Sequence, residues 1–514
     1  MLTKVYSAAI HGIDAFPVTI ETDTNSGALF SIVGLPDTSI KESHQRMMSA
    51  ITNSGIKFPR RGLTINLAPA DIKKEGAGFD LPMAIGVLTA CDLVVAENLA
   101  DYMMLGELSL DGSVLPVKGA LPAAVKAREL GFKRLIVPED NITEAGVVNR
   151  IEVYGVKNLA EAIELVSGKS RMEPIHINTR EIFAAEADSF DFDFSEVKGQ
   201  DSVKRAFEVA CAGGHNLLMI GPPGAGKSMM AKRLPSILPP LSLGEALETT
   251  KIHSVAGKLK RGSMLMTRRP FRTPHHTISP VALVGGGNTP MPGEISLAHN
   301  GVLFLDEFPE FSRQVLEVMR QPIEDRIITI SRAKYSVDYP ASFMLVASMN
   351  PCPCGYYGHP TKTCSCPPGA VSRYMNRISG PLLDRIDIQI EIQPVGFDDM
   401  ADPSPAESSS SIRERVIKAR AIQQARFQGE KGIYCNAQMN SRLLHKYAWP
   451  DEKGLQRLKE RMTRLNMSAR AFDRILRVAR TIADLEGCDH VSTTHIAEAI
   501  GYRSLDRDSY GKIF

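Results

Sequence analysis

The chain has 514 residues, which is too long for a single hydrophobic core and indicates two to four domains of ordinary size. Its 43% hydrophobic and 23% charged residues are typical of a soluble globular protein, and a net charge of +2 conceals local excesses. No apolar run has the length of a membrane span, because Asp92 interrupts the best candidate, 81–96, and the N-terminus lacks a signal-peptide pattern. We therefore expect a cytoplasmic protein with no membrane partner.

The first 170 residues alternate between strand-like and helix-like segments, which predicts a self-contained α/β domain. The clearest strands and helices are predicted at 17–21, 63–67 and 135–137 and at 39–54, 82–90 and 120–130, respectively. A charged segment rich in Asp and Phe, 171–195, is expected to link this domain to a nucleotide-binding domain at 196–395.

A glycine-rich loop follows a short apolar strand at 217–220 and precedes a helix-like segment at 229–234. It satisfies every fixed position of the G-x-x-x-x-G-K-[ST] phosphate loop, in which glycines let backbone N–H groups face the phosphates. Lys227 would reach the β and γ oxygens, and Ser228 would offer a hydroxyl to Mg²⁺. An ordinary glycine-rich turn is the alternative. The predicted nucleotide-binding residues are Gly221, Pro222, Pro223, Gly224, Ala225, Gly226, Lys227, Ser228 and Met229.

Two later strands end in polar residues. The apolar strand at 301–305 leads to Asp306 and Glu307. Because phosphoryl transfer needs positioning and charge neutralisation, we expect Asp306 to hold Mg²⁺ through its water shell and Glu307 to polarise the attacking water. The strand at 343–347 leads to Asn350, a candidate sensor of the γ-phosphate at the carboxyl edge of the sheet. An ordinary strand end and a turn residue are the respective alternatives.

Four of the eight cysteines form two C-x-C pairs within the loop 352–366. In a reducing cytosol this arrangement favours a structural zinc site over disulfides, because four thiolates can hold Zn²⁺ tetrahedrally. A redox-sensitive or unligated loop is the alternative, and His359 could replace one ligand. The predicted zinc ligands are Cys352, Cys354, Cys364 and Cys366.

An arginine between apolar residues, Arg385, ends the helix-like run at 381–387. An arginine presented to the nucleotide of a neighbouring subunit stabilises charge in the transition state, which is the arginine-finger role. The alternative is an ion pair with Asp384 or Asp387 of the same chain.

The remainder of the chain predicts a linker at 396–411, which contains two prolines and four consecutive serines, and a helical domain at 412–514. Ser468 is the expected N-cap of a long amphipathic helix. Arg470, near its start, could fold back onto the nucleotide phosphates; Arg474 is the substitute candidate, and a solvated basic face is the alternative. The helices are predicted at 411–428, 451–464, 469–486 and 493–501.

With these motifs in place, the chain resembles the magnesium-chelatase-like AAA+ ATPases, and specifically the ComM/YifB family. The resemblance covers essentially the full length and includes the strings at 269–276, 292–301 and 350–355. It implies an AAA+ core with an insert in its second helix, near 257–287, and a β-hairpin before sensor 1, within 326–339. It also implies that Arg385 is the finger and Arg470 the second sensor. The implied assembly is a homo-hexamer that uses ATP and Mg²⁺.

The same resemblance implies a DNA motor that drives branch migration of recombination intermediates, in a recombinase context, during natural transformation. Between 249 and 293 there are seven Lys or Arg and no Asp or Glu, which suits a polyanion-binding surface. Exposed loop charges give the same count. We assign a structural or interface role to His275 and His276, because neighbours in an extended segment point to opposite sides. The candidate DNA contacts are Lys258, Lys260, Arg261, Arg268, Arg269, Arg332 and Lys334.

The N-terminal domain resembles the Lon-type protease fold in the segments 74–80 and 104–119. The protease carries a serine nucleophile in the first segment and a lysine base after the second. Here a glycine stands near the serine position and Leu121 or Pro122 near the lysine position, with Lys118 as a remote substitute. The resemblance therefore implies a catalytically degenerate domain that binds DNA or builds the ring.

Two other functions share these motifs. The chain could be the motor subunit of a metal chelatase, which leaves the Lon-like domain and the cysteine loop unexplained. It could also be a protein-remodelling chaperone, which predicts an aromatic pore loop in place of the basic segment found here.

Overall fold

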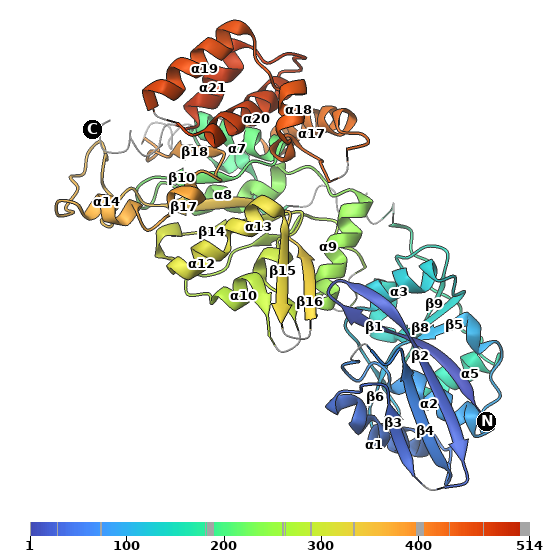
Figure 1. The fold of residues 1–514 in the computed structure, drawn as a ribbon. Helices are drawn as coiled ribbons and strands as arrows, with labels where there is room; N and C mark the ends of the chain where they lie inside the picture. The colour runs from blue at the N-terminus through green and yellow to red at the C-terminus, as the bar shows by residue number, and fades with distance from the viewer. Residues whose placement is uncertain are drawn as a thin grey trace. The chain divides into compact units, whose positions relative to one another are not determined.

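The computed structural model describes residues 2–27, 29–71, 74–179, 181, 190–259, 262, 264–287, 290–332, 335–396, 404, 406–430, 432–465 and 467–503 (Figure 1). Its contacts form two compact units, one made of 1–185 and 243–267 and the other of 186–242 and 268–514. This grouping differs from the predicted domain boundaries, because 243–267 lies with the N-terminal residues. No helix in the described part of the chain is long and apolar enough to cross a membrane.

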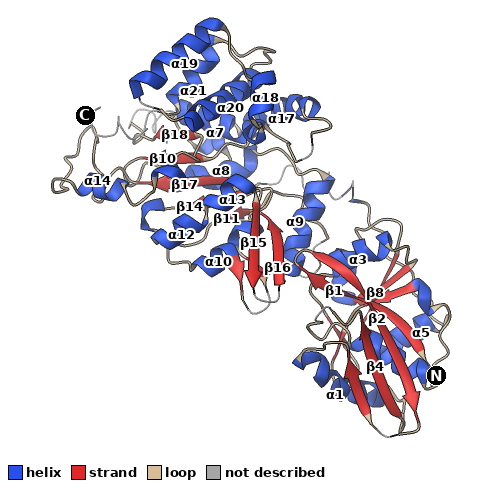
Figure 2. Ribbon diagram, viewed as in Figure 1, coloured by secondary structure: helices blue, strands red, loops and turns tan. Residues whose placement is uncertain are grey.

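The first unit is built on a seven-stranded mixed sheet in the order β3-β4-β2-β1-β5-β8-β9. The long strands β1, β2 and β4 pair antiparallel (Figure 2), and the other neighbours pair parallel. A small hairpin, β6 and β7, lies outside this sheet. The strands are β1 Thr3–His11, β2 Asp14–Asn25, β3 Phe30–Val33, β4 Gly62–Ala68, β5 Tyr102–Met104, β6 Glu107–Leu108, β7 Val114–Leu115, β8 Arg134–Pro138 and β9 Glu152–Val156.

The helices of the first unit confirm the predicted alternation of strands and helices. In α2 ten of eleven residues are buried, because this helix packs on β1 and β2 and is also in contact with α1. Asp37 begins α1 by accepting a hydrogen bond from the backbone of Ile40 at 2.8 Å. The helices are α1 Thr38–Asn53, α2 Asp80–Ala90, α3 Ala120–Glu129, α4 Ile142–Ala145 and α5 Leu159–Val166.

A further helix of this unit, α9 Leu243–Val255, comes from far along the sequence and was not predicted. It packs against α3. The Nζ atom of Lys251 lies 3.1 Å from a carboxylate oxygen of Asp14, and the Ser254 hydroxyl donates to Glu144. These contacts explain why the segment groups with the first unit although its sequence neighbours lie in the second.

The second unit contains a five-stranded, all-parallel sheet in the order β11-β14-β17-β10-β18. The strand that comes first in the chain, β10, lies between β17 and β18, so the strand order reverses beside it. Ligands bind at such a switch point, outside the carboxyl ends of the strands. The strands are β10 Leu217–Ile220, β11 Phe271–Arg272, β14 Val302–Leu305, β17 Met344–Met349 and β18 Ile388–Glu391.

Two hairpins accompany this sheet. The predicted hairpin is present as β15 Ile327–Arg332 and β16 Tyr335–Pro340, and its tip lies outside the described residues. The second hairpin pairs β12 Gly285–Gly286 with β13 Met291–Pro292. The predicted insert at 257–287 needs correction, since it includes β11, which pairs with β14 in the core sheet.

Helices flank the parallel sheet (Figure 1). Side chains of α7 and α8 share one hydrophobic core with the C-terminal helices. The flanking helices are α7 Asp201–Gly213, α8 Lys227–Ile237, α10 Pro280–Val284, α11 Glu294–Leu297, α12 Arg313–Val318, α13 Arg320–Asp325, α14 Ala370–Met375 and α15 Gly380–Leu383. The C-terminal helices are α17 Ser409–Arg426, α18 Ser441–Tyr447, α19 Glu452–Leu465, α20 Ala469–Leu485 and α21 Thr493–Gly501.

The serine run assigned to a linker is the start of α17. Ser408 is its N-cap and accepts from the backbone of Ser411. Ser409 is buried, and its hydroxyl accepts from the backbone N–H of Phe194 at 2.8 Å and contacts the Ser236 hydroxyl at 2.7 Å. Serines favour both helix caps and flexible linkers, so the composition alone did not separate the two. Ser468 caps α20 as predicted.

Candidate nucleotide site and cysteine cluster

The glycine loop joins β10, whose four residues are all buried, to the first turn of α8. Gly224 and Gly226 have φ angles of +81° and +85°, which disfavour any residue with a side chain. A Cβ atom at Gly221 would collide with the carbonyl oxygen of Ile392. The loop therefore runs directly into the N-terminus of α8. The backbone N–H groups of the loop and of the first helical turn together suit an anion.

Lys227 is buried at the start of α8, with 9% of its surface exposed. Its Nζ atom donates to the carbonyl oxygens of Gly221 at 2.6 Å and Pro222 at 2.9 Å, and to Oδ1 of Asn350 at 3.1 Å. Burial lowers the pKa of Lys227, while Asp306 and Glu307 act in the opposite direction. A buried ammonium group held by neutral oxygens in a glycine loop fits a phosphate group.

Asp306 lies between two hydroxyl groups, one in the first turn of α8 and one near the carboxyl end of β17. The Ser228 hydroxyl donates to its Oδ2 at 2.6 Å, and the Ser348 hydroxyl donates to its Oδ1. The structure thus brings together the two predicted Mg²⁺ ligands, whose oxygen atoms are the donors that this ion prefers. Ser348 was not singled out from the sequence, although its place two residues before Asn350 was the available signal.

Glu307 follows β14 in a left-handed conformation with φ of +54°. Its side chain is 58% exposed, and Oε2 lies 3.4 Å from Nδ1 of His276. The expectation that the two histidine side chains point to opposite sides is wrong, whereas their structural or interface role stays a prediction. The rings of His275 and His276 have centroids 4.1 Å apart, because a turn replaces the extended backbone that would have separated them.

The two candidate arginines differ in burial and in the hydrogen bonds described for their side chains. Arg385 is 7% exposed and donates to the carbonyl oxygen of Pro381 at 2.7 Å and to the carboxylate of Glu324. Its intrachain partner is therefore neither Asp384 nor Asp387. Arg470 is exposed in the first turn of α20, and its contact with a nucleotide stays a prediction.

Arg474, the substitute candidate for Arg470, already forms an ion pair within its own chain. It donates to Asp387, which is buried beside His215. Although burial favours the neutral acid, Arg474 and His215 hold the pKa of Asp387 well below its ordinary value. Arg474 is thus part of the packing between α20 and the strand β18.

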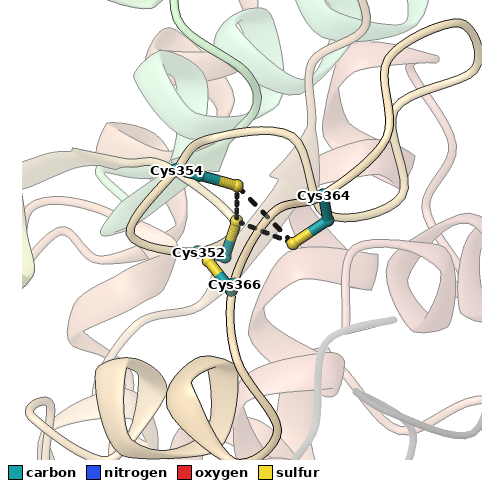
Figure 3. A group of neighbouring side chains, drawn as sticks. All are labelled: Cys352, Cys354, Cys364 and Cys366. Carbon is teal, nitrogen blue, oxygen red and sulfur yellow. Dashed lines mark hydrogen bonds between the residues drawn. The ribbon is translucent and has the colours of Figure 1, made fainter.

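The four predicted zinc ligands converge, with their sulfur atoms pointing toward one another (Figure 3). The Sγ atom of Cys352 lies 3.3 Å from that of Cys354 and 3.7 Å from that of Cys364, and all four lie within 4.8 Å of one another. Tetrahedral zinc with bonds of about 2.3 Å separates its sulfur ligands by about 3.8 Å. The distances therefore fit the ion, and these cysteines are free of disulfides.

Backbone groups stabilise thiolate charge in this cluster. The N–H of Tyr357 donates to Sγ of Cys352 at 3.3 Å. Burial opposes ionisation of Cys354, but the N–H of Tyr356 and the Cys352 thiol donate to it and lower the pKa of Cys354 to about 5. Burial and the hydrogen bond to Cys354 raise the pKa of Cys352 to about 12. A thiolate at neutral pH is the form that binds a metal.

The candidate DNA contacts are spread over both units. Lys258 is exposed in the first unit, and Arg268 is exposed in the second, 5.6 Å from the ring centre of Phe190. Arg269 donates to the carbonyl oxygens of Pro239, Pro240 and Asn300, which favours a structural role over a phosphate contact. Three candidates, and the side chain of a fourth, lie outside the described residues: Lys260, Arg261 and Lys334, and that of Arg332.

The protease-like loops of the first unit carry apolar residues at the key positions. Leu121 is fully buried, and its backbone N–H donates to Glu144 at 2.9 Å. A Cβ atom at Gly78 would lie 3.5 Å from Val117, and Lys118 lies against Gly257. Neither Gly78 nor Leu121 can supply a nucleophile or a base.

Comparisons with known proteins find relatives of both the nucleotide-binding region and the protease-like region. Family models match at 20–141 (subunit ChlI of Mg-chelatase), 193–400 (magnesium chelatase, subunit ChlI) and 406–503 (magnesium chelatase, subunit ChlI C-terminal). Lon protease 2 of Bacillus subtilis is 29% identical over 140 residues, 27% of this chain and 25% of that protein.

Two relatives align over almost the whole length. The uncharacterized protein YifB of Salmonella typhimurium is 43% identical over 509 residues. The competence protein ComM of Haemophilus influenzae is 42% identical over 513 residues. In each case the alignment covers 98% of both chains. The chain therefore belongs to the YifB/ComM family of magnesium-chelatase-like proteins.

Proposed function

We propose that this chain is an AAA+ ATPase that assembles as a homo-hexamer and drives branch migration of DNA recombination intermediates, extending heteroduplex during natural transformation. The observation that carries the proposal is the meeting of Lys227, Ser228, Asp306 and Asn350 at the switch point of the parallel sheet. Family membership implies ATP and Mg²⁺, and the name of the ComM relative supports the context of competence.

Each residue has a part that follows from its position. The loop N–H groups and Lys227 hold phosphate oxygens, and Ser228 and Asp306 would hold Mg²⁺, which neutralises phosphate charge when bound. Glu307 orients a water molecule and accepts its proton. Asn350 accepts a hydrogen bond from Lys227, which supports a role in contacting the terminal phosphate.

Arg385 is the residue that connects the proposed mechanism to assembly of the ring. As a finger it acts on the nucleotide of the next subunit, and in the chain described here it is paired with Glu324. Ring assembly would therefore exchange the partner of Arg385, and Arg470 would report closure of the C-terminal helices. The hairpin β15–β16 and the basic residues Lys258 and Arg268 are candidates to contact the DNA backbone without reading its bases.

A strand-exchange assay on a four-way DNA junction tests this function. We expect the wild type to move the branch point with ATP, and Lys227→Ala and Glu307→Gln to bind DNA but leave the branch point in place. Consumption of ATP by a wild type that leaves every such junction intact would remove the branch-migration assignment.

The match to magnesium-chelatase models favours one second candidate, the motor subunit of a complex that inserts Mg²⁺ into a tetrapyrrole. The two functions separate by what stimulates turnover. Branched DNA should raise the rate of phosphate release if the chain is a DNA motor, whereas a chelatase motor responds to its porphyrin-binding partner.

We also infer that Cys352, Cys354, Cys364 and Cys366 hold a structural zinc ion, since their sulfur spacing fits a tetrahedral site. Metal analysis of the purified chain should give one zinc per molecule. The double variant Cys352→Ser, Cys364→Ser should lose it, and an unchanged zinc content would exclude this site.

A further inference from the structure

The cysteine loop begins where the candidate nucleotide site ends. β17 runs into Asn350, whose side chain accepts from Lys227, and Pro351 and Cys352 follow directly. Cys352 is fully buried and accepts from the N–H of Tyr357. A displacement of the loop would therefore pull on the residue that contacts Lys227.

The loop also lies against the phosphate loop itself. Gly355 has a φ of +84°, and a Cβ atom placed there would lie 2.5 Å from Cδ and 2.8 Å from Cγ of Pro223. Distances this short mean that the backbone at Gly355 packs directly on the Pro223 ring. Pro223 belongs to the glycine loop, so this contact joins the two loops.

A pocket opens beside this contact. The cysteine loop contributes Tyr357, Gly358 and His359 to its wall, and the glycine loop contributes Gly221 and Pro222. Ile392 and Gln393, which follow β18, also line this pocket. The cysteine loop therefore borders the phosphate loop in two places. Gly355 packs on Pro223, and residues 357–359 line this pocket together with Gly221 and Pro222.

Little besides the cysteines can fix the conformation of this loop. Residues 352–366 contain no helix or strand, and of these fifteen described residues only Cys352 and Gly355 are buried. A segment without a core of its own is ordered by a metal when four thiolates converge. The convergent sulfur atoms thus supply the constraint that packing does not.

We propose that the zinc-bound cysteine loop is a wall of the nucleotide site, and that Gly355 transmits its position to the phosphate loop through Pro223. This inference rests on the proposed nucleotide function and adds a positioning role for a residue that contacts no phosphate. Removal of the metal then weakens nucleotide binding although every residue of the phosphate loop is retained.

The first test compares two glycines with the same backbone requirement. Gly355→Ala places a methyl group against Pro223, whereas Gly369→Ala, at φ of +76°, places it where no atom lies within 4 Å. We expect Gly355→Ala to weaken binding of a fluorescent ATP analogue at least tenfold in the full chain. Gly369→Ala should stay within about twofold of the wild type, because it carries only the backbone cost. Both variants should retain one zinc ion.

The second test removes the clash and the metal separately. Adding Pro223→Ala to Gly355→Ala should restore part of the lost affinity, since the methyl group then has room, and a double-mutant cycle measures this coupling. Cys354→Ser should release zinc and weaken analogue binding to a similar extent. Circular dichroism and the unfolding midpoint identify any variant that fails to fold.

The outcomes separate two failures. A wild type that does not bind the analogue contradicts the proposed function. A wild type that binds, together with equally tight binding by Gly355→Ala and by the folded, zinc-free Cys354→Ser chain, overturns the coupling alone. Equal weakening by Gly355→Ala and Gly369→Ala would also overturn it, because backbone strain would then explain the effect.

Discussion

The two units each bury a lysine beside a glycine-containing loop, but the surroundings of the two lysines differ. Lys227 meets neutral carbonyl oxygens, the amide of Asn350 and the field of two carboxylates. Lys74 is fully buried and donates to the carbonyl oxygen of Pro69. Burial lowers the pKa of both lysines, so a perturbed lysine alone does not identify an active site.

What distinguishes the site in the second unit is convergence. Polar side chains from β14, β17 and the start of α8 meet within hydrogen-bonding distance around Asp306 and Lys227. In the first unit the protease-like segments hold a glycine near the serine position and Leu121 or Pro122, both buried, near the lysine position. The first unit thus carries Lon-like sequence without a serine and a lysine at these two positions.

The largest effect expected concerns Arg385 and Lys227. Each alanine variant should lower ATP turnover by about a thousandfold, because in the proposed mechanism Arg385 supplies a transition-state cation and Lys227 the ammonium group that holds the phosphates. Mixing the two inactive variants should restore turnover, since a finger from the Lys227→Ala subunit can then serve the intact loop of the Arg385→Ala subunit. Phosphate release measures both. Mixtures that remain inactive would mean that Arg385 acts within its own chain, through Glu324.

Leu121→Ala should expose the structural character of the protease-like region. It leaves a cavity in a fully buried site and should lower the free energy of unfolding by about 2–5 kcal/mol. Leu130→Ala, at a residue that is 49% exposed, should cost less than about 1 kcal/mol. Denaturant unfolding of both variants provides the comparison. Equal effects would contradict the assignment of Leu121 to the core.

His276→Ala should lower turnover about tenfold, because Glu307 loses the group that orients it. His276→Gln, which keeps a hydrogen-bond donor, should recover most of the rate. The matched control is His275→Ala, because the His275 ring lies beside that of His276 but its Nδ1 atom is hydrogen-bonded to Thr277. The kcat of the three variants decides the point, and an unchanged kcat in His276→Ala would make the contact incidental.

The smallest effect is expected at Lys74. Replacement by methionine removes a buried ammonium group of the first unit and should leave ATP turnover per folded molecule within about twofold of the wild type. Phosphate release, corrected for the folded fraction by circular dichroism, measures it. A loss as large as that of Lys227→Ala would show that the two buried lysines belong to one function.

The sequence predicted those features that are encoded locally. The strand at 217–220 and the helix at 493–501 have the predicted bounds, and the strands that lead to Asp306 and Asn350 lie side by side in the parallel sheet. Short-range patterns determine these features, because side-chain periodicity and the requirements of a glycine loop act within a few residues.

Features that depend on distant segments were missed. The pairing of Arg385 with Glu324, the contact of Ser348 with Asp306 and the approach of His276 to Glu307 each join separate elements. No spacing in the chain encodes such meetings. The membership of α9 in the first unit was missed for the same reason.

The discontinuity of the first unit limits how the chain can be divided. A fragment that ends at 185 would contain α3 and Glu144 but would lack the helix that packs on them, together with the bonds from Lys251 and Ser254. Such a truncation should yield an aggregation-prone product with a newly uncovered apolar face. A stable recombinant first unit therefore requires residues 243–267. They can be supplied as a separate peptide or joined to the C-terminus of the fragment that ends at 185.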